Sequence, residues 1–259
     1  MKICFTTSLF GDLSKLDRPA KFNRLNNYDY ILFTDSDTTI QSSWDVMNVK
    51  NHPKISSVES SIKKSRYPKF LSWQILESMG LNYDVIFYCD LCFYPNPKVN
   101  WHDLSHNIIS CSNFSFVQTV HQDPTVRNGG VLEEMKLIIN NKRDSTESMI
   151  KTKDIFISID DSVNLKAPQY YENTCFGFST QDARVKKITE EFWRLYTEED
   201  MSFRDQPLWN FLLLKNDIKP LVKNDFKYNT NNFINDTSWF IFCPQNLGTM
   251  RNNYLTFKQ

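Results

Sequence analysis

Short, mostly apolar runs that end on polar residues recur along the first third of the chain. They lie at residues 2–10, 30–33 and 85–89. Runs of this kind are typical of strands buried on both faces of a parallel sheet. Residues 44–49 alternate between apolar and polar positions, which predicts a short strand with one exposed face. The first part of the chain is therefore expected to form a largely parallel sheet.

Helical spacing of apolar residues appears between and after these strands. The predicted helices cover 70–79, 129–140, 182–196 and 207–214. Further strands are predicted at 108–111, 114–120, 155–159, 175–178 and 239–243. This order predicts an α/β fold with a Rossmann-like mixed sheet, mostly parallel in its first half and flanked by helices. No linker or repeat divides the chain, so we expect one domain, 1–259, with halves 1–100 and 101–259.

Charged or polar residues lie in several of these strands, directly after them or close to them in the sequence. Asp35 follows the second strand, Asp90 follows the strand at 85–89, and Thr6 lies in the first strand. Arg66 and Lys69 belong to a basic segment ahead of the helix at 70–79. Right-handed crossovers bring the carboxyl ends of parallel strands to one edge, where open α/β sheets bind ligands. We expect these five residues to share a cleft there.

Plainer roles exist for the same residues. Asp90 could instead simply cap a turn. Residues 63–69 could instead form a solvated segment before a helix. Asp205 suits a helix N-cap. Glu133 and Glu134 suit the surface of a helix, with a role toward an acceptor as the alternative, and His121 suits either the surface or the cleft.

Composition narrows the classes of function. Only six glycines occur, and neither G-x-G-x-x-G nor G-x-x-x-x-G-K-[ST] is present, which disfavours dinucleotide and P-loop sites. Lys plus Arg and Asp plus Glu balance at 30 each, so no nucleic-acid partner is indicated. The six cysteines are scattered and suit buried free thiols. Without a signal peptide or a long apolar run, we expect a soluble, cytoplasmic protein with no integral membrane segment.

The predicted cleft has mixed charge. Arginine and lysine bind diphosphate, and a carboxylate together with diphosphate oxygens is the usual setting for Mg²⁺ or Mn²⁺. A nucleoside diphosphate ligand would use both kinds of group. The metal would then act as a Lewis acid on the departing diphosphate.

This pattern resembles the GT-A-fold glycosyltransferases, which use nucleotide-sugars. Asp90-Leu91-Cys92 occupies the place of their Asp-x-Asp motif, with Cys92 in place of the second Asp. The segment 205–210, DQPLWN, is similar to the Asp-Gln-x-x-Leu-Asn motif of the retaining, glycogenin-like family. The segment 245–251 has the spacing of a late His-x-x-Gly-x-x-Lys motif, with Gln245 for His and Arg251 for Lys.

The order of segments over residues 1–220 also resembles the glycosyltransferase-like domain of plant mucilage-synthesis and turgor-regulation proteins. The matching segments are Phe33-Thr34-Asp35, Trp44-Asp45-Val46, Arg66 to Lys69, Tyr88-Cys89-Asp90, Glu133-Glu134 and Arg204-Asp205-Gln206. The resemblance implies a GT-A-like fold with a nucleotide-binding half, 1–100, and an acceptor-side half, 101–259. It implies a hexosyl- or pentosyltransferase that moves a sugar, with retention, from a nucleotide-sugar to a hydroxyl of a glycan or glycoconjugate.

The resemblance also implies a role for each site residue. Asp205 and Gln206 would be catalytic, near the anomeric carbon. The donor-binding residues would be Thr6, Asp35, Arg66, Lys69, Asp90, Arg204 and Arg251. Mn²⁺ or Mg²⁺ would be held by Asp90, Cys92 and Gln245. Two other functions remain open: a catalytically silent module that binds a nucleotide-sugar or glycan, and a hydrolase of lipid or sugar amides.

Overall fold

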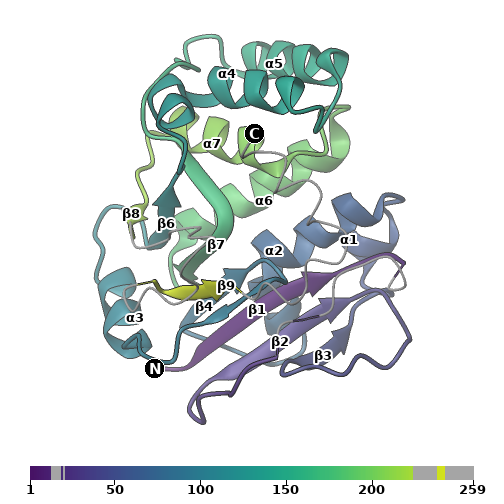
Figure 1. Cartoon of the computed structure of the whole chain (residues 1–259), viewed down its shortest axis with the longest axis vertical. Coiled ribbons are helices and arrows are strands. Elements are labelled where there is room, and N and C mark those ends of the chain that lie inside the picture. Colours follow the sequence, from purple (N-terminus) through teal and green to yellow (C-terminus); the bar gives the residue numbers. More distant parts are fainter. Residues whose placement is uncertain (13–18, 20, 224–237, 243–259) are drawn as a thin grey trace, which may run out of the picture. The chain divides into compact units, whose positions relative to one another are not determined.

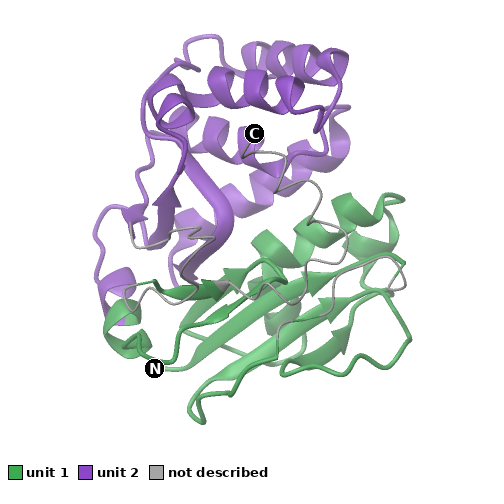
Figure 2. Ribbon diagram, in the orientation of Figure 1, with its two compact units in different colours: residues 1–105, 225–259 green, residues 106–224 purple. Residues whose placement is uncertain are grey.

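The chain forms two compact units, each built from strands and helices (Figures 1 and 2). Unit 1 comprises residues 1–105 and 225–259, and unit 2 comprises residues 106–224. The computed structural model describes residues 1–12, 19, 21–223 and 238–242. The predicted α/β class is confirmed. The division of one domain into halves at residue 100 stays a prediction.

Unit 1 is built on a four-stranded parallel sheet. Its strands are β1 (Ile3–Leu9), β2 (Asp29–Thr34), β3 (Asp45–Asn48) and β4 (Val85–Cys89), in the order β3-β2-β1-β4. Every residue of β4 is buried, as its unbroken apolar run predicted. The chain runs outward from β1 to β3 and then returns to the other side of β1. The strand order therefore reverses between β1 and β4, and all four carboxyl ends share one edge.

Two helices, α1 (Pro53–Ser56) and α2 (Ser61–Ser78), follow β3. The prediction that α2 starts near residue 70 is wrong, because the hydroxyl of Ser60 caps the helix by accepting a hydrogen bond from the Lys63 backbone N–H. Pro68 lies inside α2, and Leu71 has non-helical angles, φ −119° and ψ 27°. Proline lacks a backbone N–H and bends helices. The helix packs against β1 and β4, and Lys69 at this bend is buried.

Aromatic rings fill the core of unit 1. The Phe5 ring stacks on those of Tyr30 and Phe87, at centroid distances of 5.2 and 5.5 Å, and meets Trp101 edge-on at 4.7 Å. A small antiparallel sheet pairs β5 (Phe93–Pro95) with β9 (Phe240–Phe242), which confirms a strand near 239–243. Trp101 begins α3 (Trp101–Ile109), so the strand predicted at 108–111 is wrong.

Unit 2 combines three strands with four helices. The strands are β6 (Phe116–Val120), β7 (Tyr171–Ser179) and β8 (Leu221–Val222), with β6 antiparallel to β7 and parallel to β8. The helices are α4 (Pro124–Asn140), α5 (Thr146–Ile159), α6 (Ala183–Glu198) and α7 (Asp205–Lys215). The strand predicted at 155–159 is the end of α5, because Met149, Thr152 and Phe156 bury one helical face.

Five described cysteines are free. Cys4, Cys89 and Cys175 are buried, as predicted, whereas Cys92 and Cys111 are half-buried. Within the described ranges, no helix is both long and apolar enough to cross a bilayer.

Gly130 divides α4 with a backbone conformation that is almost restricted to glycine, φ +66° and ψ −151°. A Cβ atom here would lie 2.5 Å from the Ala167 carbonyl oxygen and 2.8 Å from that of Leu165. The backbone N–H of Leu132 donates to the same Leu165 oxygen at 3.2 Å. The second half of α4 therefore starts in close backbone contact with the segment before β7.

Gly130→Ala is expected to destabilise the protein by about 3 kcal/mol, because backbone strain adds to a clash with rigid carbonyl groups. Gly80→Ala is the matched control, since Gly80 also has a positive φ of 74° but nothing lies within 4 Å of its added Cβ. The control is expected to lose about 1 kcal/mol. Chemical denaturation measures both, and equal losses would contradict the role of the close approach.

Candidate functional site

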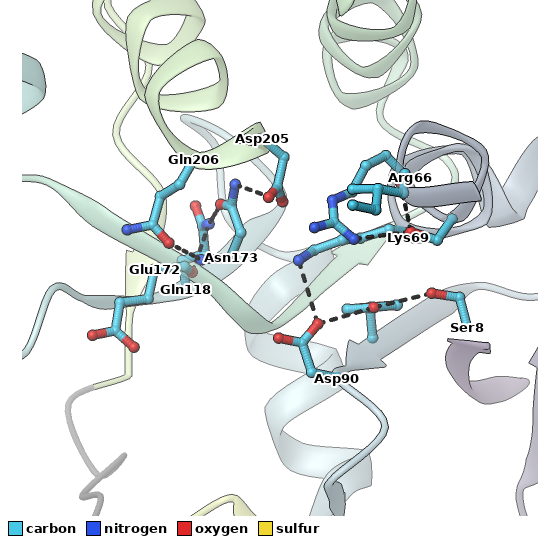
Figure 3. Close-up of polar contacts among 12 residues, drawn as sticks. Ser8, Arg66, Lys69, Asp90, Gln118, Glu172, Asn173, Asp205 and Gln206 are labelled. Atoms are coloured by element: carbon cyan, nitrogen blue, oxygen red, sulfur yellow. Dashed lines mark hydrogen bonds and ion pairs between the residues drawn. The ribbon is translucent and has the colours of Figure 1, made fainter. Parts of the chain in front are cut away.

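A chain of polar contacts crosses the carboxyl edge of β1 and β4 in unit 1 (Figure 3). The Tyr88 hydroxyl donates to Asp90 Oδ1 at 3.0 Å and lies 3.3 Å from the Ser8 Oγ. Burial, followed by the nearby Asp90 charge, raises the pKa of Tyr88 well above its ordinary value, so this phenol keeps its proton. Since that single proton goes to Asp90, the Ser8 hydroxyl must donate to Tyr88. The contacts thus run from Ser8 through Tyr88 to Asp90.

Lys69 and Arg66 reach the same edge from α2. The Lys69 ammonium lies 3.4 Å from Asp90 Oδ1, and its side chain is 4% exposed against 39% for Asp90. The same ammonium lies 5.2 Å from the centroid of the Tyr88 ring. Arg66 donates to the Ser65 hydroxyl at 2.9 Å, and its charge acts to lower the pKa of Tyr88. Lys69 therefore meets the carboxylate at the end of β4, while the Arg66 charge acts on the neighbouring Tyr88 from the same helix.

Asp35 also lies at this edge, and Thr6 does not. The carboxylate of Asp35, just after β2, accepts a hydrogen bond from the Gly11 backbone N–H at 2.9 Å, just after β1. Thr6 is fully buried within β1, and its hydroxyl donates to the Phe87 carbonyl at 3.4 Å. Ser8, two residues later on the same face of the strand, provides the hydroxyl at the edge. No spacing rule singled out Ser8, because its role depends on how β1 and β4 align.

The residues around Asp90 do not fit a divalent cation. Both described contacts of the carboxylate end on Oδ1, and one of them comes from a buried ammonium that would repel a second cation. Cys92, in place of a second Asp, offers sulfur, which hard cations bind poorly. Among the residues that the structure describes, no three acidic, histidine or cysteine side chains form a group suited to a metal. Gln245 and Arg251 lie outside the described residues.

Asp205 and Gln206 lie at the start of α7 in unit 2. Asp205 is the first helical residue and Arg204 holds the N-cap position, so Asp205 is not itself the cap. Asn173 on β7 donates from Nδ2 to Asp205 Oδ2 at 3.4 Å, and its backbone N–H donates to Gln206 Oε1 at 3.3 Å. The Asp205 side chain is thereby tied to the strand beside it, with 6% of the residue exposed.

Gln118 on β6 extends this network. Its Nε2 donates to Asn173 Oδ1 at 2.8 Å (Figure 3). Its Oε1 accepts from the Trp209 Nε1 at 3.0 Å. Asn210 fixes α7 to β7 by accepting from the Tyr171 N–H at 2.7 Å and donating to its carbonyl at 2.9 Å. Asn173 and Gln118 were missed in the sequence, because single amides inside strands carry no periodic signal.

Two adjacent glutamates of α4 lie in different surroundings. Glu133 pairs with Lys136 at 2.8 Å and remains 29% exposed, as a helix-surface charge should. Glu134 is 2% exposed, and its Oε2 lies 3.5 Å from His121 Nε2 without a hydrogen bond. Burial raises the pKa of Glu134 to about 7, while the charges of Arg204 and Arg143 act to lower it. The prediction of a surface position is therefore wrong for Glu134.

Comparison with models of known protein families gave no match, and a search of curated proteins found no significant similarity. The functional assignment therefore depends on the residues of this chain.

Glu134→Gln is expected to stabilise the protein at pH 8 and to leave its stability at pH 4 nearly unchanged. The acid has a folded pKa of about 7 against an ordinary 4.5, so the unfolded state ionises first as pH rises through this window. Wild-type stability falls across it, by about 3 kcal/mol if the whole shift acts. The neutral amide avoids this loss.

Urea denaturation at both pH values measures the effect, with Glu133→Gln as the matched control. A Glu134→Gln protein that is less stable than wild type at pH 8 would show that the buried carboxylate is satisfied in solution.

Proposed function

We propose that the protein is a glycosyltransferase that moves a sugar from a nucleotide-sugar to an acceptor hydroxyl, with retention. One observation carries the proposal: the polar contacts from Ser8 to Lys69 lie where the strand order reverses between β1 and β4. In open α/β sheets, nucleotides bind at this position, outside the carboxyl ends of the strands. The Gly-rich phosphate loop common at such sites is absent from the sequence, so cationic side chains take its role.

Different residues of unit 1 bind different parts of the nucleotide-sugar donor. Lys69 and Arg66 neutralise the diphosphate, and Arg66 can do so through its planar fork. Asp90, with its exposed carboxylate face, accepts hydrogen bonds from ribose hydroxyls, and Asp35 serves the base or ribose. The leaving diphosphate is stabilised by fixed positive charge rather than by a metal ion. Asp205 and Gln206 of unit 2 serve the transferred sugar and the acceptor.

Binding of the donor is tested by thermal shift with UDP-, GDP- and dTDP-sugars. A ligand at 100 times its dissociation constant stabilises the folded state by about 2.7 kcal/mol. Lys69→Met, which keeps the volume of the buried stem, is expected to abolish the shift, and Lys54→Met on the exposed helix α1 should retain it. Because the residues at Asp90 do not fit a divalent cation, EDTA and Mn²⁺ should leave the shift unchanged. If nucleotide-sugars stabilise the protein only when Mn²⁺ is present, the proposal that Lys69 neutralises the diphosphate in place of a metal ion is wrong.

Catalysis is tested by release of nucleoside diphosphate from the sugar that binds. Asp205→Asn and Asp90→Asn are each expected to reduce turnover at least about tenfold, a loss of about 1.4 kcal/mol in transition-state stabilisation. Binding without turnover in the wild type would favour the alternative, a silent nucleotide-sugar-binding module. Full turnover in both variants would overturn the site assignment.

A further inference from the structure

Unit 2 contains a cavity of about 340 Å³ beside the C-terminal part of α7. Its lining residues lie between 167 and 171, ahead of and at the start of β7, and between 210 and 219. At about 30 Å³ for each water molecule, this volume corresponds to roughly eleven waters. Sites for small molecules begin at about 300 Å³. Among the described residues, none with a role in the proposed transfer reaction lines this cavity.

The most buried lining residues, Tyr171, Asn210 and Leu213, form the floor of the cavity. They are 4%, 2% and 2% exposed. The two hydrogens of the Asn210 amide go to the carbonyls of Tyr171 and Gln206, each at 2.9 Å, and its Oδ1 accepts from the Tyr171 N–H at 2.7 Å. The Asn210 side chain and the Tyr171 backbone therefore bond each other and have little left to offer a ligand.

The Tyr171 hydroxyl is the polar group of the floor that is left over. Within the part of the chain that the structure describes, the hydrogen bonds of Tyr171 are those of its backbone. Its hydroxyl is not among the enclosed atoms that lack a partner, so it keeps some accessible surface. Burial raises the pKa of this phenol, which stays protonated at neutral pH. It can therefore both donate a hydrogen bond to a ligand and accept one from it.

The exposed lining residues form the rim of the cavity, and their charges balance. They are Pro168, Gln169, Asp217 and Lys219. Asp217 and Lys219 carry opposite charges, and the residues of the floor carry none. A charged group that moved from the rim to the floor would lose its water without gaining an opposite charge. The cavity therefore favours an uncharged molecule.

The walls between rim and floor are apolar and are held by backbone hydrogen bonds. The half-buried wall residues are Ala167, Leu214 and Ile218. The Ile218 N–H donates to the Leu213 carbonyl at 2.8 Å, which ends α7 in a tight turn. Across the cavity, the Gln169 N–H donates to the Arg127 carbonyl at 2.9 Å and holds Gln169 at a positive φ of 76°. Both sides of the cavity are thus formed without a ligand.

We propose that this cavity binds a small, uncharged amphipathic molecule. Its apolar body, about the size of one six-membered ring, contacts Leu214 and Ile218. Its hydroxyl or amide end forms a hydrogen bond with the Tyr171 hydroxyl. The site belongs to unit 2 alone and goes beyond the proposed transferase function.

Saturation-transfer NMR titrations of the full chain test the site with five probes that share one ring. Benzyl alcohol and benzamide have an uncharged polar end, toluene has none, and benzoate and benzylamine are charged. The alcohol or the amide is expected to bind the wild type at millimolar concentration, more tightly than either charged probe. Tyr171→Phe should weaken that binding about fivefold, the effect of one hydrogen bond, and leave the affinity for toluene unchanged.

Matched variants establish the place of binding. Ile218→Trp fills the cavity and should abolish binding of every probe, whereas Ile150→Trp on the exposed face of α5 should behave like the wild type. Tyr171→Phe should leave the unfolding temperature nearly unchanged, because its hydroxyl has no partner in the described chain. Tyr196→Phe should lower that temperature and keep the probe affinities, because the Tyr196 hydroxyl donates to the Phe203 carbonyl.

Four results would each overturn the proposal. The first is that neither the alcohol nor the amide binds the wild type. The second is that a charged probe binds more tightly than both. The third is that Tyr171→Phe leaves the affinities for the alcohol and the amide unchanged, or lowers that for toluene as much. The fourth is that a folded Ile218→Trp protein still binds, since the binding is then elsewhere.

These outcomes are separable from that of the donor test. If the uncharged probes bind and no nucleotide-sugar stabilises the chain, the proposed transferase function fails and this site stands. If nucleotide-sugars bind through Lys69 and no probe binds, this site fails and the donor site stands.

Discussion

Parallel pairing of β1 with both β2 and β4 is the constraint on which unit 1 depends. It places the carboxyl ends of the strands at one edge, where Gly11, Asp35 and Asp90 follow β1, β2 and β4. It also opposes Thr6 to Tyr88, which brings the next same-face residue of β1, Ser8, within reach of the tyrosine hydroxyl. A shift of one residue in this pairing would turn Ser8 to the other face and break the chain of contacts.

The strands of unit 1 were predictable because a strand that is buried on both faces has an unbroken run of apolar residues in the sequence. The apolar run at 85–89 and the carboxylate after it led to β4 and to the position of Asp90. The start of α2 was not predictable by the same means, since residues 61–69 are polar and basic and contain Pro68. Packing against β1 and β4 overrides these local preferences. The burial of Lys69 follows from that packing and has no local signal.

Unit 2 shows two ways in which a fold treats buried polar groups. The network of Gln118, Asn173 and Asp205 links each member to another and fixes the start of α7. Glu134 is buried to a similar degree, and its Oε2 has no hydrogen-bond partner among the described residues. In the sequence, Glu133 and Glu134 are equivalent, and only the docking of α4 separates them. Buried polar groups without a hydrogen bond are expected at functional sites, where a residue that serves a chemical role can lower the stability of the fold.

The buried ammonium of Lys69 has a consequence for the end of a reaction cycle. A metal ion that arrives with a nucleotide can also depart with it, but a lysine on α2 stays with the protein. In the proposed reaction, the same fixed charge that receives the substrate also holds the nucleoside diphosphate left behind. Retention of product, rather than bond cleavage, would then limit the rate, as it does in many enzymes. Exposure of the neighbouring Asp90, at 39%, gives water a route to compete for the departing product.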